Sequence, residues 1–263
     1  MLIPIGDQLA EIGVLGGSGF YELLTAPAGE VEQVELDTPY GAPAGPITIA
    51  TVAGRRVAFL ARHGRGHEYA AHRVPFRANV WALASLGIRC LLGPCSVGSV
   101  RPGIEPGDFV VVDQLVDRTW GRRDTFHDVG GEEPTSGGVH HQPFAEPYDA
   151  AVRAVLVDAG RAAGVRIHDG GTMVVVNGPR FSTRAESAWF RDMGWDVVNM
   201  TGYPEAVLAA EAGVPYASIA LVTDRDAGTS AGEGVTMEAV LTVMHDNVAR
   251  VRTVLEVAIA RLP

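Results

Sequence analysis

The chain has 263 residues, of which 47% are apolar and 20% are charged, and its formal net charge is −10. This composition is that of an ordinary folded protein and excludes an intrinsically disordered chain. The negative charge and the lack of any run of Lys and Arg argue against a nucleic-acid partner, but they do not exclude a small anion as a ligand.

Two cysteines, Cys90 and Cys95, are present, and their spacing fits neither a disulfide framework nor a Cys-x-x-Cys site. A reducing, cytoplasmic compartment is therefore expected. The first ten residues lack the basic start of a signal peptide, and no apolar run approaches the roughly 20 residues that cross a bilayer. We therefore expect no membrane partner.

In the N-terminal half of the chain, short apolar stretches of strand length precede and follow one stretch with helical periodicity. The expected elements are strands at Ile12–Leu15, Ile47–Val52, Arg56–Leu60, Cys90–Leu92 and Phe109–Val112, and a helix at Pro75–Leu86. Ala53-Gly54 between two of these strands predicts a hairpin turn. The segment Asp117–Pro147 is rich in Gly, His, Glu and Pro without a period, which is typical of a long functional loop.

In the C-terminal half, helices and strands alternate more regularly. The expected helices are Tyr148–Ala163, Thr183–Met193, Pro204–Ala212 and Val235–Ile259, and the expected strands are Thr172–Val176, Val197–Met200 and Tyr216–Thr223. This alternation predicts a single α/β domain over residues 1–263, with a central, largely parallel sheet flanked by helices. Ligands bind such sheets at the carboxyl ends of the strands, so the polar residues there form the candidate site.

Three of these strand ends carry groups that suit an anion. Gly16-Gly17-Ser18-Gly19 offers backbone donors and a hydroxyl, although it lacks the dinucleotide-binding fingerprint and the Lys of a P-loop. Arg62-His63 offers a bidentate guanidinium and an imidazolium. Cys95-Ser96 is predicted to be a turn of small residues with backbone donors. Each motif by itself is also consistent with a plain turn or a surface pair.

A fourth strand end carries the carboxylates of Asp224 and Asp226. On an extended segment, side chains two residues apart share a face. Paired carboxylates in a cleft keep a proton near neutral pH, which a leaving group can accept. A solvated acidic turn is the alternative interpretation. His63, His67 and His72 lack the further ligands of a recognisable metal site, and no metal is expected there.

A set of matching stretches, in order from about residue 12 to 245, shows a resemblance to the trimeric purine nucleoside phosphorylase family, and within it to the 5'-methylthioadenosine phosphorylases. The stretches are Gly16–Gly19, Asp37–Gly41, Leu60–Gly64, Asn79–Leu83, Pro106–Asp108, Asp113–Thr119, Gly178–Glu186, Asn199–Thr201, Pro204-Glu205 and Thr223–Asp226. The resemblance implies a mixed, partly barrel-like sheet and a homotrimer. It also implies phosphorolysis of 5'-methylthioadenosine to adenine and 5-methylthioribose 1-phosphate, a purine salvage reaction with inorganic phosphate as co-substrate and no cofactor.

The resemblance also implies the residue roles. Phosphate would be bound by Ser18, Arg62, His63, Cys95, Ser96 and Thr201. The nucleoside would be bound by Phe181, Ser182, Met200, Asp224, Asp226, Met237, Val240, Leu241 and His141, the last reaching a neighbouring subunit's 5' pocket. Asp224 and Asp226 are the catalytic candidates, with Asp224 near N7 of the base.

The chemistry of the residues bears on the choice of substrate. A carboxylate accepts the 6-amino group of adenine, whereas a 6-oxopurine would favour an amide, although a protonated Asp could donate instead. Met237, Val240 and Leu241 form one apolar helix stripe, which suits a methylthio group and is also what ordinary core would show. A phosphorylase of 6-oxopurine nucleosides or methylthioinosine is the nearest alternative, followed by a hydrolytic nucleosidase and a dinucleotide- or nucleoside-binding protein.

Overall fold

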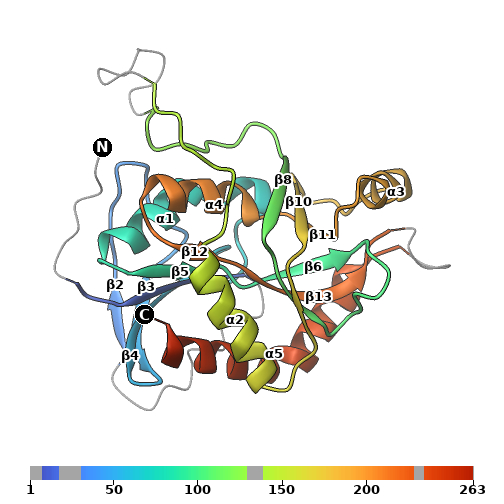
Figure 1. The fold of residues 1–263 in the computed structure, drawn as a ribbon. Coiled ribbons are helices and arrows are strands. Elements are labelled where there is room, and N and C mark those ends of the chain that lie inside the picture. The colour runs from blue at the N-terminus through green and yellow to red at the C-terminus, as the bar shows by residue number, and fades with distance from the viewer. Residues whose placement is uncertain (1–7, 18–30, 129–138, 228–233, 263) are drawn as a thin grey trace.

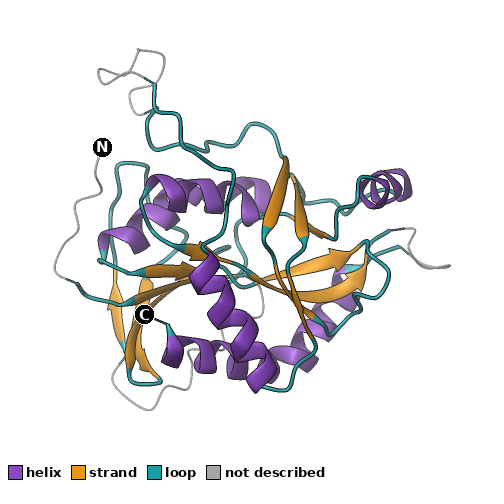
Figure 2. Ribbon diagram, in the orientation of Figure 1, coloured by secondary structure: helices purple, strands orange, loops and turns teal. Residues whose placement is uncertain are grey.

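The computed structural model describes residues 8–17, 31–128, 139–227 and 234–262, and its strands form a curled mixed sheet with helices on both faces (Figure 1, Figure 2). One part of the sheet has the strand order β12-β5-β1-β4-β3-β2, and the other has the order β8-β10-β11-β6-β13-β7-β9. Seven of the eleven described strand pairs are parallel. The predicted mixed, mostly parallel sheet is confirmed.

The strand bounds agree closely with the predictions where a strand is apolar and buried. The strands are β1 Ile12–Gly16, β2 Glu32–Val34, β3 Ile47–Val52, β4 Arg55–Ala61, β5 Cys90–Leu92, β6 Cys95–Ser99, β7 Phe109–Val111, β8 Gln114–Arg118, β9 Ile167–Asp169, β10 Thr172–Val176, β11 Val197–Asn199, β12 Tyr216–Ala217 and β13 Ile219–Arg225. The predicted hairpin joins β3 and β4, and both of its turn residues have positive φ, 50° at Ala53 and 79° at Gly54. Such a pair of values suits the right-handed twist of the two strands.

The two parts of the sheet are joined at two places. Only Gly93-Pro94 separates β5 from β6, and only Ser218 separates β12 from β13. Strand β5 pairs in parallel with β12 in one part, and β6 pairs in parallel with β13 in the other. The two neighbouring chain segments therefore pass side by side from one part of the sheet into the other. The sheet therefore curls at this corner, where the strand ends face a common interior.

Two pairs of helices cover the two faces of the sheet. The helices are α1 Phe76–Ser85, α2 Ala150–Ala162, α3 Arg184–Asp192, α4 Gly202–Glu211 and α5 Met237–Arg261. Helix α1 packs with α4, α2 packs with α5, and α3 stands apart beside β11 (Figure 1). Asp149, Thr183 and Thr236 cap α2, α3 and α5 with side-chain oxygens, which fixes where these helices begin.

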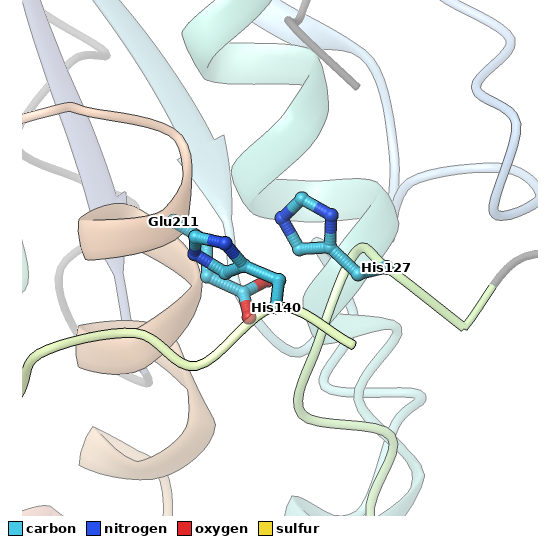
Figure 3. A group of neighbouring side chains, drawn as sticks. All are labelled: His127, His140 and Glu211. Carbon is cyan, nitrogen blue, oxygen red and sulfur yellow. The ribbon is translucent and has the colours of Figure 1, made fainter. Parts of the chain in front are cut away.

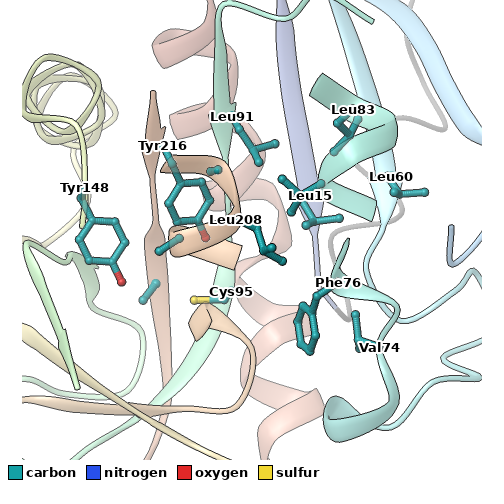
Figure 4. Packing of buried hydrophobic residues seen from close by; sticks show 14 of the residues in the cluster. Leu15, Leu60, Val74, Phe76, Leu83, Leu91, Cys95, Tyr148, Leu208 and Tyr216 are labelled. Atoms are coloured by element: carbon teal, nitrogen blue, oxygen red, sulfur yellow. The ribbon is translucent and has the colours of Figure 1, made fainter. Parts of the chain in front are cut away.

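The core consists mainly of two apolar layers, one under each helix pair. Figure 4 shows the first layer, in which Leu15 of β1 and Leu60 of β4 meet Leu83 of α1 and Leu208 of α4. The second layer packs α2 and α5 against the opposite face of the sheet. In each layer, side chains from distant parts of the sequence pack closely together. The curled part of the sheet, where β5 leads into β6, therefore has a packed layer on each face.

Two predictions of local structure were wrong. Cys95–Ser99 forms strand β6 rather than a turn, and the strand predicted as Tyr216–Thr223 is interrupted at Ser218 and extends to Arg225. The small residues that suggested a turn are required by packing, because β6 lies between β11 and β13 in the sheet. Gly and Ser in a strand mark a close approach of neighbouring groups as often as they mark a turn.

The predicted long loop begins two residues later than expected, after strand β8. Strand β8, Gln114–Arg118, pairs in parallel with β10 and takes in the first two residues of the segment Asp117–Pro147. The rest of that segment contains no helix or strand in the residues that are described, namely up to 128 and from 139. Among the described helices none has the length and apolar character that spanning a bilayer requires.

Candidate active site

A cavity of about 560 Å³ lies at the corner of the sheet, along β6 and beyond the carboxyl ends of β1, β4, β10, β11 and β13. The lining residues are Gly17, Arg62, His63, His67, Glu68, Ala70, Ala71, Cys95, Ser96, Val97, Gly98, Pro179, Phe181, Ser182, Val198, Asn199, Met200, Thr201, Thr223, Asp224, Asp226, Met237, Val240 and Met244. The cavity thus lies where ligand sites of α/β sheets are found.

Most of the predicted site residues meet at this cavity, although they come from distant parts of the chain. Those that line it are Arg62, His63, Cys95, Ser96, Phe181, Ser182, Met200, Thr201, Asp224, Asp226, Met237 and Val240. Leu241 is not among the lining residues, and its side chain is 45% exposed. His141 is exposed and does not line the cavity of its own chain. Ser18 lies outside the described residues.

Arg62 is buried and is held on all sides by protein groups. Its Nε and Nη2 donate to both carboxylate oxygens of Glu205, Nη2 also donates to the Leu15 carbonyl at 2.7 Å, and Nη1 donates to the Pro94 carbonyl at 3.2 Å. The fork that was expected to bind phosphate in a bidentate manner is therefore occupied by Glu205. Within the described part of the chain, one Nη1–H remains for a ligand.

The Arg62–Glu205 pair has its own support. Tyr216 donates its hydroxyl hydrogen to Glu205 Oε2 at 3.1 Å, and both members of the pair are at most 1% exposed. Burial lowers the pKa of Arg62, but the charge and the hydrogen bonds of Glu205 raise it by more, so the guanidinium stays charged. The pair brings an oriented donor to the cavity with little net charge.

His63 differs from its predicted state. Its Nδ1 lies 2.8 Å from the Tyr69 carbonyl oxygen, which can only accept, so Nδ1 carries the hydrogen. Burial, aided by the charge of Arg62, lowers the pKa of His63 to about 4. The imidazole is therefore neutral near pH 7, and its Nε2 is an acceptor rather than the expected imidazolium donor. A bound anion would raise this pKa.

Thr201 is positioned by a short network between β11 and β6. The side-chain oxygen of Asn199 accepts from the backbone N–H of Thr201 at 2.7 Å and of Gly202 at 2.6 Å. Its amide nitrogen donates to the Ser96 carbonyl at 3.0 Å. This network fixes the first turn of α4 against β6, next to Arg62. We call the group formed by Arg62, His63 and Thr201 the arginine end of the cavity.

Cys95 is unsuited to act as a nucleophile. Its side chain is 4% exposed, and its sulfur lies 3.5 Å from the Ser218 hydroxyl. Burial raises the pKa of the Cys95 thiol to about 11, so the thiolate is not formed near neutral pH. Cys95 contributes packing at the start of β6.

Asp224 and Asp226 form the other end of the cavity, which we call the aspartate end. Burial raises the pKa of Asp224 to about 6, against a hydrogen bond from the Thr223 hydroxyl at 2.8 Å that lowers it, and the charge of Asp226 adds to the rise. Burial also raises the pKa of Asp226, whose Oδ2 accepts from the Ser187 hydroxyl. Near neutral pH a fraction of Asp224 is therefore protonated.

Strand β6 runs from the arginine end of the cavity to the aspartate end. Pro94, just before β6, accepts from Arg62, while Gly98 and Ser99 at its far end pair with Asp224 and Arg225 of β13. Four residues of strand at about 3.3 Å each separate these two contacts by roughly 13 Å along the backbone of β6. A donor end and an acid end thus lie along one strand with a cavity between them.

Several residues that shape the site were given no role in the sequence analysis. Glu205 was part of a matching stretch, but its pairing with Arg62 spans 143 positions of the sequence. Gly98 is needed because a Cβ there would lie 2.8 Å from Asp224 Oδ2. Met244, one turn beyond Val240 and Leu241, extends the helix stripe, and that period was a signal that could have found it.

Comparisons with known proteins identify the family of the chain. The model of the phosphorylase superfamily matches residues 11–260. A purine nucleoside phosphorylase of Streptomyces coelicolor is 52% identical over 97% of this chain and 90% of its own. An S-methyl-5'-thioadenosine phosphorylase of Mycobacterium tuberculosis is 51% identical over 95% and 89%. A methylthioadenosine phosphorylase structure from Schistosoma mansoni in complex with adenine superposes with a TM-score of 0.88, at 39% identity over 96% and 91% of the two chains.

Proposed function

Because the chain belongs to the phosphorylase superfamily, we propose that it cleaves 5'-methylthioadenosine with inorganic phosphate to give adenine and 5-methylthioribose 1-phosphate. The observation that carries this proposal is the pairing of an oriented donor end with an acid end in one cavity. Several similar proteins, from bacteria, archaea and vertebrates, carry the name S-methyl-5'-thioadenosine phosphorylase.

The proposed reaction uses the two ends in one step. A phosphate oxygen attacks C1' of the sugar, the C1'–N9 bond breaks, and its electron pair passes to the purine. The arginine end would hold phosphate through Nη1–H of Arg62 and the Thr201 hydroxyl, together with Ser96 and Ser18, and His63 would accept from a protonated phosphate oxygen. Asp224 would give its proton to N7 as negative charge builds on the base. The nucleophile is itself a substrate, so the reaction as proposed needs no cofactor.

The remaining cavity residues suit the nucleoside. Asp226 would accept from the 6-amino group of adenine, and Phe181 with Ser182 would lie against the base, since Ser182 is next to the cap of α3, whose Ser187 contacts Asp226. Met200 would contact the ribose. Met237, Val240 and Met244 offer an apolar surface to the 5' substituent, where a hydroxyl would lose its partners.

Assembly and location stay predictions. We propose a homotrimer, in which Leu241 and His141 would complete a 5' pocket from positions that are exposed in the single chain. A cytoplasmic location is proposed from the two unpaired, buried cysteines.

The decisive test is the release of adenine from 5'-methylthioadenosine with and without added phosphate. The proposal expects release only with phosphate and formation of the sugar 1-phosphate in equal amount. Full activity in phosphate-free buffer would identify a hydrolase and overturn it.

A second candidate follows from the S. coelicolor relative, which is named purine nucleoside phosphorylase. If that name reflects a 6-oxopurine substrate, inosine or methylthioinosine would be cleaved faster than 5'-methylthioadenosine at equal phosphate. The two acceptors at the aspartate end favour the 6-amino base. Comparison of kcat/KM for the three nucleosides decides between the candidates.

A further inference from the structure

Outside the cavity, two histidines and a glutamate meet from three separate segments (Figure 3). His127 follows β8 in the loop, His140 lies in the segment that leads to α2, and Glu211 is the last residue of α4. Their ligand atoms all lie within 4.8 Å of one another, and the two imidazole rings are 4.3 Å apart between centroids. None of the three lines the cavity.

The glutamate is held in one orientation by the loop that carries His127. Thr125 donates its hydroxyl hydrogen to Glu211 Oε1 at 2.8 Å, and the backbone N–H of Phe126 donates to Oε2 at 2.7 Å. The Thr125 hydroxyl also accepts from the backbone N–H of His127 at 3.1 Å. Each carboxylate oxygen keeps a lone pair, so the hydrogen bonds orient the group without using up its capacity as a ligand.

The orientation of His140 is also compatible with a ligand role. Its Nε2 lies 3.1 Å from the side-chain oxygen of Gln142, whose amide nitrogen in turn donates to the Pro143 carbonyl at 3.2 Å. Because the amide oxygen can only accept, Nε2 carries the hydrogen and Nδ1 presents its lone pair. Metal-binding histidines commonly donate the other ring hydrogen in this way.

We propose that His127, His140 and Glu211 bind one zinc ion, with water in the fourth position. Two imidazoles and one carboxylate form a donor set that zinc prefers, whereas magnesium and calcium take oxygen ligands almost throughout. Tetrahedral zinc with bonds of about 2.0–2.2 Å brings its ligand atoms to roughly 3.4 Å from each other. The present spacing of up to 4.8 Å must therefore contract when zinc binds.

The ion would act as a clip rather than as part of the proposed reaction. It would join the loop up to residue 128, the segment from residue 139 and the end of α4. Hydrogen bonds from Thr125 and Phe126 to Glu211 already link the loop to α4. The ligands lie outside the cavity, so zinc binding and nucleoside cleavage can be measured independently. The proposal therefore stands even if the proposed function fails.

Calorimetric titration of the full-length, chelator-dialysed protein with zinc sulfate tests the site. We expect one zinc ion per chain and a rise in Tm of several degrees on saturation, because an ion that binds only the folded state stabilises it. His140→Gln and His127→Gln should each weaken zinc binding at least 100-fold. His245→Gln, which removes an exposed histidine of α5 outside the cluster, is the matched control and should bind zinc as the parent does.

Cobalt titration adds a spectroscopic test of the same ligands. Tetrahedral cobalt should give a visible absorption band in the parent and in His245→Gln but not in His140→Gln, and magnesium chloride should give no binding heat. Far-ultraviolet circular dichroism checks that the variants fold; His140 is exposed, so its variant has no buried contacts to lose. Failure of the parent to bind zinc would overturn the proposal. Zinc binding retained in a His127→Gln/His140→Gln double variant would also overturn it, and the stacked His63 and His67 would then be the next histidines to test.

Discussion

The two ends of the cavity differ in how their buried charges are stabilised. At the arginine end, a buried positive charge is matched by the buried Glu205, so the end is nearly neutral and its donors are fixed before any ligand arrives. At the aspartate end, hydroxyl groups donate to the two carboxylates, Thr223 to Asp224 and Ser187 to Asp226, and burial raises both pKa values. One end is preorganised by a matched ion pair, and the other keeps a proton because burial disfavours the charged carboxylate.

This contrast predicts that the two ends respond differently to pH and to substitution. An end built on a matched ion pair should contribute to stability at every pH near neutral, because removal of either partner leaves the other charge buried and uncompensated. An end built on buried acids should cost stability once it ionises and should matter chiefly for the reaction. Substitutions at each end can therefore break or sharpen the comparison.

The largest expected effect belongs to Asp224→Asn. The amide cannot give up a proton, so adenine release should fall by about 10²–10⁴-fold, the usual contribution of a general acid. Steady-state assay of 5'-methylthioadenosine cleavage measures the loss. Asp158→Asn, on the exposed face of α2, is the control and should keep full activity.

The same variant tests the stored proton through stability. The pKa of Asp224 is raised to about 6 from an ordinary 3.8, so its favourable contribution is complete below about pH 4 and is lost as pH rises through 6. At pH 8 the parent should therefore be less stable than Asp224→Asn by up to about 3 kcal/mol, and the difference should shrink toward pH 4. Urea unfolding at the two pH values decides; a gap independent of pH would contradict the burial of an acid at this end.

The next effect in size belongs to the arginine end. Glu205→Gln leaves the Arg62 charge buried without its partner, which should cost about 3–5 kcal/mol of unfolding free energy and raise the KM for phosphate as the guanidinium turns. Urea unfolding at pH 7 and phosphate titration measure the two effects.

The matched control is an exposed arginine–glutamate pair of α5. Arg252 and Glu256 are 39% and 45% exposed, so Glu256→Gln should cost no more than about 1 kcal/mol and leave the KM for phosphate unchanged. Equal losses in the two variants would show that burial of the Arg62–Glu205 pair carries no special cost, and the comparison between the ends would fail.

A smaller, local effect is expected from Gly98→Ala. The new Cβ would lie 2.8 Å from Asp224 Oδ2, so the carboxylate or β6 must move, at a cost of about 1–3 kcal/mol. The specificity constant for the nucleoside should fall while the KM for phosphate stays near that of the parent. Gly45→Ala, which meets nothing within 4 Å, is the control. If the KM for phosphate changed as much as the specificity constant for the nucleoside, the two ends would be coupled through β6 rather than separate.

The sequence predicted the parts of the site that lie next to one another in the chain better than the parts that meet only in space. Asp224 lies on β13 and Asp226 directly follows its end, and both line the cavity, as the alternation of side chains along an extended segment predicted. The neutral state of His63 and the occupation of the Arg62 fork by Glu205 depend on burial and on a partner 143 positions away, which no local pattern reports.

The fold shows the same division between local and long-range information. Buried apolar strands such as β5 and β10 were placed to the residue because hydrophobicity and flanking turns define them. Strand β6 was mistaken for a turn because its small residues are dictated by the approach of Asp224 from a neighbouring strand. At Gly98, therefore, the requirement of the site overrides the local preference of the residue.

The smallest expected effect concerns the apolar wall beside the two ends. Met237 and Leu241 lie on α5 with nearly the same exposure, 44% and 45%, yet only Met237 lines the cavity. Met237→Ser should lower the preference for 5'-methylthioadenosine over adenosine by about 10-fold, since one thioether contact contributes roughly 1–3 kcal/mol of discrimination. In the proposed homotrimer, Leu241→Ser should also lower the ratio of the two kcat/KM values, because assembly would bring this face of α5 to the substrate. An unchanged ratio would show that the single chain forms the 5' pocket without Leu241, and the apolar wall, like the two ends, would then belong to the chain rather than to the oligomer.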